Sequence, residues 1–117
     1  MLSGVHSILI IVPRDAMAVR GQEAKFTCSS DKRDAITWRY DGQATESIMV
    51  GRVVKNKFIQ KYEMTRNEEI TVFTVKNVSL SDSGNYTCVD ELGLGEEASA
   101  ELIVLGELAY NYSIYRH

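Results

Sequence analysis

The side chains of this chain of 117 residues that could carry out catalysis are not arranged for it. Its two histidines, His6 and His117, lie at opposite ends, and no order of nucleophile, base and orienting acid indicates a catalytic triad. Gly93 and Gly95 open no helix, so they predict a tight hairpin and not a phosphate-binding loop. We therefore expect a non-catalytic protein with no cofactor and no metal site.

The two cysteines belong to a longer pattern of residue types. The run from Asp82 to Cys88 reads D-x-G-x-Y-x-C, and Cys28 lies ten residues before the single tryptophan, Trp38. This order of cysteine, tryptophan and cysteine, with a tyrosine two residues before the second cysteine, resembles the immunoglobulin superfamily. The resemblance covers almost the whole chain.

The resemblance implies an all-β fold, an immunoglobulin-like two-sheet Greek-key sandwich whose sheets are joined by a disulfide between Cys28 and Cys88. Trp38 would pack against the bridge, and the Tyr86 hydroxyl would bond to nearby backbone as a tyrosine corner. Gly84 suits a tight turn before the strand that carries Tyr86. Cysteines paired in this way leave no thiolate for a metal or for catalysis.

Asp82 resembles the acid that, in this family, pairs with a base near the start of strand D. Arg52 and Lys57 are both candidates for that base, and the sequence does not choose between them.

Period-two alternation predicts seven or more short strands and no helix of useful length. Pro13 is expected to split the first strand, where the edge strand moves from one sheet to the other. Asp41 and Gly42 predict a hairpin turn in which the glycine supplies a positive φ. Six further strands are expected over residues 24–29, 36–40, 46–50, 57–62, 70–76 and 98–105.

Length and charge set further limits. With 44% hydrophobic residues, the chain predicts one domain over residues 1–107 and a linker or stalk over residues 108–117. The net charge of −3 gives no general basic field, so neither nucleic-acid binding nor direct membrane contact is expected. The longest apolar run, at 8–12, is far shorter than the roughly 20 residues that span a bilayer. Any signal peptide and membrane anchor are expected to lie outside these residues.

The subtype within the superfamily bears on where partners would bind. Residues 95–104 resemble the closing strand of intermediate-set domains, whereas the 59 residues between the cysteines suit the variable type. We interpret the chain as an intermediate-set domain with variable-like length in its middle. Partners in this family commonly meet the sheet face built by strands G, F, C and C′, called here the GFCC′ face. Alternation indicates these candidate interface residues: Thr37, Arg39, Met49, Thr87, Val89, Glu101 and Ile103.

Three N-x-[ST] sequons begin at Asn77, Asn85 and Asn111. Since N-glycosylation and stable disulfides both belong to the secretory route, the sequons and the cysteine pair favour an extracellular or cell-surface location. Asn85 falls on the GFCC′ face, where a glycan would obstruct a flat contact between sheets.

Charged residues gather in two groups that could steer a partner. One group surrounds the F–G hairpin and is acidic, and the other lies from C′ to D and is basic. The acidic group is Asp90, Glu91, Glu96 and Glu97, and the basic group is Arg52, Lys55, Lys57 and Lys61.

These observations favour a non-catalytic extracellular recognition or adhesion module of a cell-surface receptor or adhesion molecule. It would bind a protein ligand or a second copy, as a homodimer, through the GFCC′ face and the BC and FG loops. One alternative is a structural spacer of an intracellular cytoskeletal or muscle protein, against which the sequons count. Another is a secreted innate-immune recognition domain, which these residues do not separate from a receptor.

Overall fold

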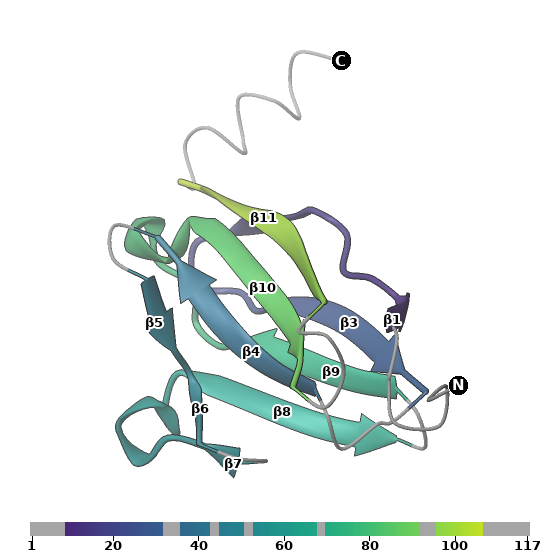
Figure 1. Ribbon diagram of the computed structural model, residues 1–117. Helices are drawn as coiled ribbons and strands as arrows, with labels where there is room; N and C mark the ends of the chain where they lie inside the picture. Colours follow the sequence, from purple (N-terminus) through teal and green to yellow (C-terminus); the bar gives the residue numbers. More distant parts are fainter. Residues whose placement is uncertain are drawn as a thin grey trace, which may run out of the picture.

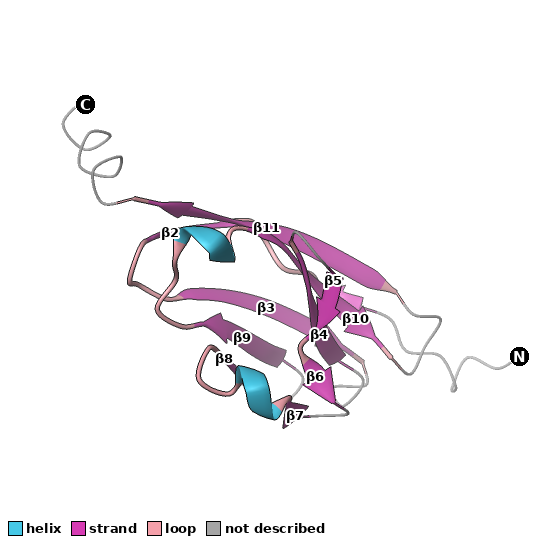
Figure 2. Cartoon of the chain, turned by 90° about the vertical axis from the view of Figure 1, so that its left-hand side faces the viewer, coloured by secondary structure: helices cyan, strands magenta, loops and turns pink. Residues whose placement is uncertain are grey.

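Two β-sheets pack face to face in the computed structural model, which describes residues 9–31, 36–42, 45–50, 53–67, 70–91 and 96–106 (Figure 1). The first sheet consists, in spatial order, of β1 (Leu9–Ile11), β3 (Ala24–Ser30), β9 (Ile70–Val75) and β8 (Tyr62–Asn67). The second consists of β2 (Ala16–Val19), β11 (Glu97–Leu105), β10 (Gly84–Asp90), β4 (Ile36–Asp41) and β5 (Thr45–Ser47). A separate hairpin pairs β6 (Met49–Val50) with β7 (Val53–Val54). The expected all-β sandwich is confirmed, and Figure 2 shows its two layers in profile.

The core lies between the sheets and is built from the side chains at alternate positions along each strand, which point inward. Its centre is aromatic: the Phe73 ring stacks on Trp38 with ring centroids 4.9 Å apart and on Tyr62 at 5.3 Å. Phe26 extends this layer by stacking on Tyr86 at 5.4 Å. Such large apolar side chains contribute most of the free energy of burial in a small sandwich.

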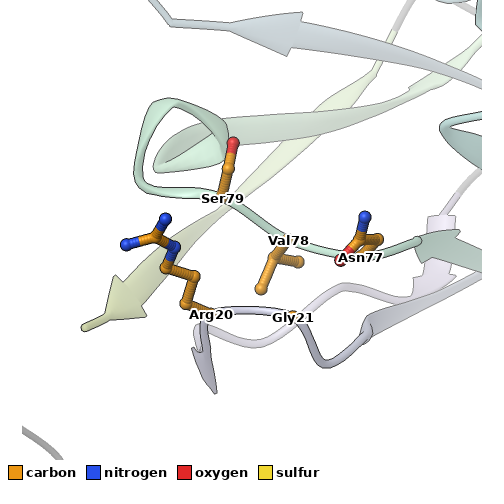
Figure 3. Close-up of a pocket in the computed structure, with 5 residues that line it drawn as sticks. All are labelled: Arg20, Gly21, Asn77, Val78 and Ser79. Carbon is orange, nitrogen blue, oxygen red and sulfur yellow. The ribbon is translucent and has the colours of Figure 1, made fainter. Parts of the chain in front are cut away.

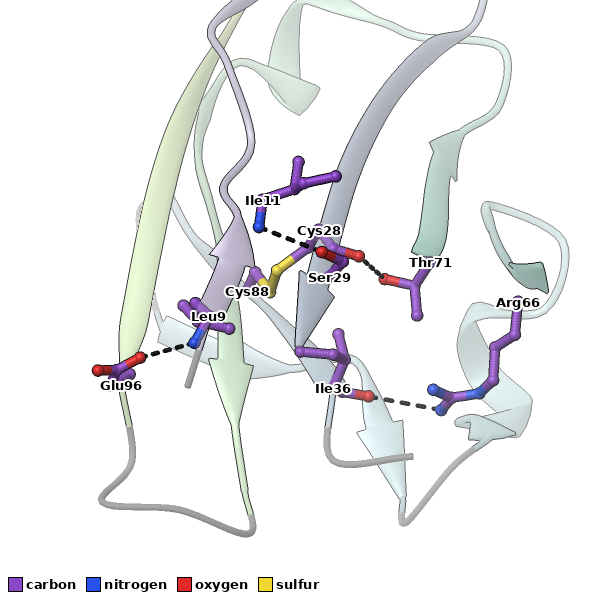
Figure 4. The surroundings of a disulfide bond; sticks show 9 residues. All are labelled: Leu9, Ile11, Cys28, Ser29, Ile36, Arg66, Thr71, Cys88 and Glu96. Carbon is purple, nitrogen blue, oxygen red and sulfur yellow. Dashed lines mark hydrogen bonds between the residues drawn. A yellow bond between two sulfur atoms is a disulfide. The ribbon is translucent and has the colours of Figure 1, made fainter. Parts of the chain in front are cut away.

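The disulfide between Cys28 and Cys88 connects β3 to β10 across this core, with 6.5 Å between the two Cα atoms. Both cysteines are fully buried. Next to the bridge, the Thr71 hydroxyl donates a hydrogen bond of 3.0 Å to the Cys28 carbonyl, as Figure 4 shows. The inter-sheet bridge implied by the family resemblance is therefore confirmed.

The first strand is split at Pro13, as the sequence predicts. β1 pairs antiparallel with β3 in the first sheet, whereas β2 pairs parallel with β11 in the second. Pro13 is buried between the two segments. Because proline has no N–H to donate, it suits the point at which the chain leaves one ladder for the other.

The prediction of strand D over residues 57–62 is wrong. Residues Asn56–Phe58 form a 3-10 helix, η3, and strand D is β8, which begins at Tyr62. The Phe58 N–H donates to the Lys55 carbonyl at 2.8 Å, and the Phe58 ring meets the Tyr62 ring edge-on. The apolar residues at 58 and 59 therefore belong to a local turn and not to a β-ladder. The sequence pattern that resembled a strand begins before the strand itself does.

Two glycines lie next to the Tyr40 ring for different reasons. Gly84 has φ +141°, and a Cβ there would lie 3.1 Å from the ring, so the expected tight turn before β10 requires glycine. The φ of Gly42 is outside the left-handed region, so the prediction of a positive φ there is wrong. A Cβ at Gly42 would overlap the Tyr40 ring. Steric clearance therefore explains Gly42.

Candidate protein-binding face

The outer surface of β11, β10, β4 and β5 is the GFCC′ face, and the strand register fixes its rows of side chains. One row runs Arg39, Thr87, Ser99 across β4, β10 and β11. Their sequence neighbours Trp38 and Cys88 point into the core, so these three side chains point outward.

Arg39 is the central residue of this face because its guanidinium reaches across β10. Its Nη1 and Nη2 donate to the two Glu97 carboxylate oxygens on β11 at 3.1 and 3.0 Å. Its Nε and Nη2 donate to Asp41 on β4 at 2.8 and 3.3 Å. The hydrogen bonds to Glu97, and then those to Asp41, raise the pKa of Arg39 above its ordinary value. Forked pairing of this kind fixes the geometry of a planar cation.

Thr87 lies on the outer side of β10, as alternation predicts, but its side chain is covered. Thr87 is fully buried although it points outward, because the Arg39 side chain passes over it. Its hydroxyl donates to Asp41 Oδ2 at 2.5 Å and shares a hydrogen bond of 2.7 Å with Ser99 Oγ. The centre of the face is thus a closed polar network whose partners are already satisfied within the chain.

Apolar side chains flank this network. Val89 is half-buried beside Thr37, and Ile103 is 40% exposed. Met17 on β2 is the register neighbour of Ile103 and is 65% exposed. Both Ile103 and Met17 therefore lie on the solvent side of the edge formed by β2 and β11.

Met49 does not join these exposed residues, and the prediction that it lies on the outer surface is wrong. Only β5 pairs with β4, while the next strand, β6, belongs to the separate hairpin. The Ile48 N–H donates to the Trp38 carbonyl where the chain leaves the sheet, and Ile48 and Met49 are both buried. Met49 instead lines a surface depression of about 330 Å³ together with Thr37, Ser47 and Glu91.

The base that pairs with Asp82 is Lys61, whose Nζ lies 2.5 Å from Asp82 Oδ2. Of the two expected candidates, Lys57 does not form this pair and Arg52 lies outside the described residues. The error follows from the misplaced strand D, because Lys61 immediately precedes the true start of β8. Asp82 also accepts the Ser79 N–H at 2.7 Å and so caps the 3-10 helix η4 (Leu80–Asp82).

The tyrosine corner involves the same helix. The Tyr86 hydroxyl donates to the Asp82 carbonyl at 2.8 Å within the core. Burial holds the pKa of Tyr86 above its ordinary value, so the hydroxyl stays a donor. This bond anchors β10, and with it the outward neighbour Thr87, to the loop before it.

The acidic group around the F–G hairpin is smaller than the sequence indicates. Asp90 is fully buried, because its position on β10 points inward, so it is not part of an exposed tip. Glu91 is exposed and accepts the Thr37 hydroxyl at 2.8 Å, and Glu96 accepts the Leu9 N–H. These carboxylates connect neighbouring segments, whereas the hairpin tip at 92–95 lies outside the described residues.

The sequons fall at different places. Asn77 is exposed in the loop after β9, and Asn85 is exposed on β10, opposite Asp41 and Glu101. Asn111 lies outside the described residues, as does the expected linker at 108–117, so the domain boundary stays a prediction.

The part of the chain that the structure describes contains neither a membrane-spanning helix nor a cluster of metal-binding side chains. Within these ranges, no helix has the length and hydropathy to cross a bilayer. No group of three potential metal ligands occurs among the same residues.

Glu97→Gln is expected to lower the free energy of unfolding by about 0.2–1 kcal/mol at neutral pH, because the Glu97 side chain is 46% exposed and solvent screens the pair. The hydrogen bond from Arg39 holds the pKa of Glu97 below its ordinary value. Ionised Glu97 therefore stabilises the fold above its unfolded-state pKa, and this stabilisation is lost as pH falls through its folded-state pKa. Urea unfolding of variant and parent should thus differ at neutral pH and converge in acid. A pH-independent difference would contradict the ion pair, and Glu63→Gln on β8 is the control.

Comparison with known proteins identifies the family of this chain. A family model described as Immunoglobulin I-set domain matches residues 8–104. The chain belongs to the immunoglobulin I-set family. Members of this family are binding and structural modules and are generally non-catalytic.

Two curated relatives of the I-set domain come from different classes of protein. It is 31% identical to titin of Drosophila melanogaster over 81 residues and 31% identical to neural cell adhesion molecule L1 of Mus musculus over 100 residues. These alignments cover 68% and 80% of the chain but 0% and 7% of the two relatives. The chain therefore spans only a small part of either protein's length.

Solved structures that resemble the I-set domain include complexes. The RIG-5 IG1 homodimer matches with TM-score 0.75 and 23% identity over 86% of this chain and 98% of that one. Dpr1 IG1 bound to DIP-eta IG1 matches with TM-score 0.66 and 19% identity, over 86% and 97%. A titin and obscurin-like 1 Ig complex matches with TM-score 0.65 and 16% identity, over 86% and 94%. At such identities these likenesses show the shared fold.

Sequence reasoning missed Asp41, Ser99 and Glu97 as members of the network on the face. The proximity of Ser99 and Arg39 to Thr87 could have been found from the pairing of the strands, because both residues lie opposite Thr87. The contact between Arg39 and Glu97 could not have been found in this way, since it is diagonal and depends on the rotamer of a long side chain.

Proposed function

We propose that this I-set domain is a non-catalytic recognition module of a cell-surface receptor or adhesion molecule and that it binds a protein partner through the GFCC′ face. The observation that supports this most is the Arg39 network. It holds β4, β10 and β11 in one fixed surface, so a partner meets side chains that are already ordered. Binding to a pre-organised surface loses less conformational entropy.

The apolar residues beside the network suit such a contact. Val89 is half-buried, and Ile103 and Met17 remain exposed on the β2–β11 edge. A polar centre flanked by apolar contact area is compatible with a reversible protein interface. The BC and FG loops fall on residues 32–35 and 92–95, outside the described residues, so their contribution is part of the proposal alone.

Charge favours a basic partner over a second copy of the chain. The five strands of this sheet contain a single basic residue, Arg39, which is engaged by two carboxylates. The acidic residues that point outward on β4, β10 and β11 are Asp41, Glu97 and Glu101, since Asp90 is buried on the inner side of β10. A symmetric face-to-face dimer would bring like charges together, which costs free energy, whereas lysine or arginine on a partner would complement them.

An extracellular location is supported by the buried disulfide, which oxidising compartments preserve, and by the two exposed sequons. A second candidate function, an intracellular structural spacer, is favoured by the likeness to titin. The likeness to the adhesion molecule L1 favours the first.

Val89→Arg is expected to weaken partner binding about tenfold or more, because it places a bulky cation, with its hydration, at a close-packed contact. The partner would first be selected by probing a displayed library of cell-surface ectodomains with a multimer of this chain. Affinities of parent and variant would then be measured by surface plasmon resonance.

The matched control is Val72→Arg, because Val72 is equally half-buried but lies on the outer surface of the opposite sheet. Thermal midpoints of both variants should stay close together. Equal affinities of Val89→Arg and the parent would reject the GFCC′ face as the binding surface.

A further inference from the structure

The loop between β9 and η4 contains a sequon, Asn77-Val78-Ser79, that the proposed binding face does not use. Asn77 is exposed, and its side-chain amide makes no hydrogen bond within the described chain. Only its main chain is engaged, since the Asn77 carbonyl accepts Lys61 Nζ at 3.0 Å. The atom to which an N-linked sugar would attach is therefore free.

The backbone around Asn77 is rigid although the side chain is free. The Val78 N–H donates to the Gln22 carbonyl and the Gly21 N–H donates to the Val78 carbonyl, both at 2.8 Å. Val78 itself is buried. Figure 3 shows Val78 directed toward the segment with Gly21, while the amide nitrogen of Asn77 is directed away from it. The loop thus presents Asn77 outward from a fixed base.

Space is available beside this side chain. Asn77 lines an open depression of about 620 Å³ together with Arg20, Gly21, Val78 and Ser79. A sugar on the amide nitrogen would meet solvent and polar groups, and no strand would have to move. Exposed polar loops of this kind accept large, solubilising modifications.

The position of Asn77 also keeps a glycan away from the GFCC′ face. Lys61 donates to the Asn77 carbonyl, and Gln22 accepts the N–H of the next residue, Val78. These two partners precede β8 and β3, which belong to the opposite sheet. Asn85, in contrast, lies on the face itself, near the start of β10 and between Asp41 and Glu101. A glycan at Asn85 would cover the surface that the proposed function requires.

We infer that Asn77 is an N-glycosylation site, whose glycan shields the end of the sandwich at the β9–η4 loop and leaves the GFCC′ face open. This inference rests on the extracellular part of the proposed function. The sugar class follows from the N-x-[ST] acceptor, in which the serine hydroxyl is needed for transfer to the asparagine.

The structure also supplies matched variants. Asn77 has φ +46°, a conformation that aspartate tolerates nearly as well as asparagine, so Asn77→Asp removes the acceptor without new backbone strain. Ser79 is the N-cap residue of η4, and Ser79→Thr retains both the cap and the sequon. Asn85→Asp removes the competing acceptor on the face.

The test is the intact mass of each chain secreted from a eukaryotic host, before and after peptide N-glycosidase, with peptide mapping of the parent. We expect loss of one glycan in Asn77→Asp and its retention in Ser79→Thr and Asn85→Asp. Peptide mapping that finds Asn77 bare in the secreted parent would overturn the inference, even if a variant failed to fold. A glycan lost in Asn85→Asp would leave the Asn77 assignment standing and overturn the proposed binding face instead.

Discussion

Replacing Cys28 and Cys88 together by alanine is expected to lower the free energy of unfolding by about 4 kcal/mol. The bridge closes a loop with a sequence separation of 60, and in the chain-entropy account the cross-link removes that much conformational freedom from the unfolded chain. A domain of this size has only about 5–15 kcal/mol of stability in total, so the variant should be close to unfolded at 37 °C.

Urea unfolding of the oxidised parent, the reduced parent and the double variant measures this effect. The reduced parent and the alanine variant should fall by similar amounts, because both lack the cross-link while the surrounding core is conserved. Cys28→Val with Cys88→Val is the control for lost side-chain volume. If all these proteins unfolded within about 1 kcal/mol of the oxidised parent, the bridge would not be a main stabilising element.

The outcome also bears on function. A domain that depends on its bridge needs an oxidising compartment, and the domains of a cell-surface receptor fold and remain in such compartments. A spacer in the cytosol must instead fold with both thiols reduced. A large loss on reduction would therefore strengthen the extracellular proposal, and a small one would strengthen the structural alternative suggested by titin.

The parts of the fold that could be predicted from the sequence are those set by residue type at fixed spacing. Cys28, Trp38 and Cys88 indicated the bridge between sheets, and alternation indicated the strands on either side of it. Pro13 marked the change of sheet because a missing N–H has the same consequence in any ladder. Each of these features depends on the backbone or on a covalent bond, and not on the conformation of a long side chain.

The errors concern side chains whose neighbours lie far away in sequence. Thr87 points outward as alternation requires, but its burial depends on Arg39 crossing from β4 to Glu97. Met49 was misplaced because the chain leaves the sheet one residue earlier, at Ile48, where two successive side chains turn inward. Alternation predicts only which face of a strand a residue occupies. It predicts neither what covers that face nor where pairing stops.

The pairing of Asp82 shows how one such error leads to another. The sequence identified the acid correctly as one that needs a base near the start of strand D, but strand D begins five residues later than predicted. Lys61, and not Lys57, therefore lies at that start. The cause was the 3-10 helix η3, because its Phe58 and the following Ile59 lie at strand-like positions.

Phe73→Ala is expected to lower the free energy of unfolding by about 3–5 kcal/mol, the usual cost of removing a buried aromatic ring. Phe73 is fully buried, and its ring lies against Trp38 from the facing sheet and Tyr62 from the neighbouring strand. The cavity would therefore open at the point where the two sheets meet, beneath Arg39 and Thr87 of the GFCC′ face. Urea unfolding measures the loss, and Val72→Ala, the adjacent half-buried residue on the same strand, should cost clearly less. Native-state hydrogen exchange adds the functional readout, because β10 amides should exchange faster in Phe73→Ala if the core layer holds the face flat. An exchange rate unchanged from the parent would show that the Arg39 network keeps the face ordered by itself.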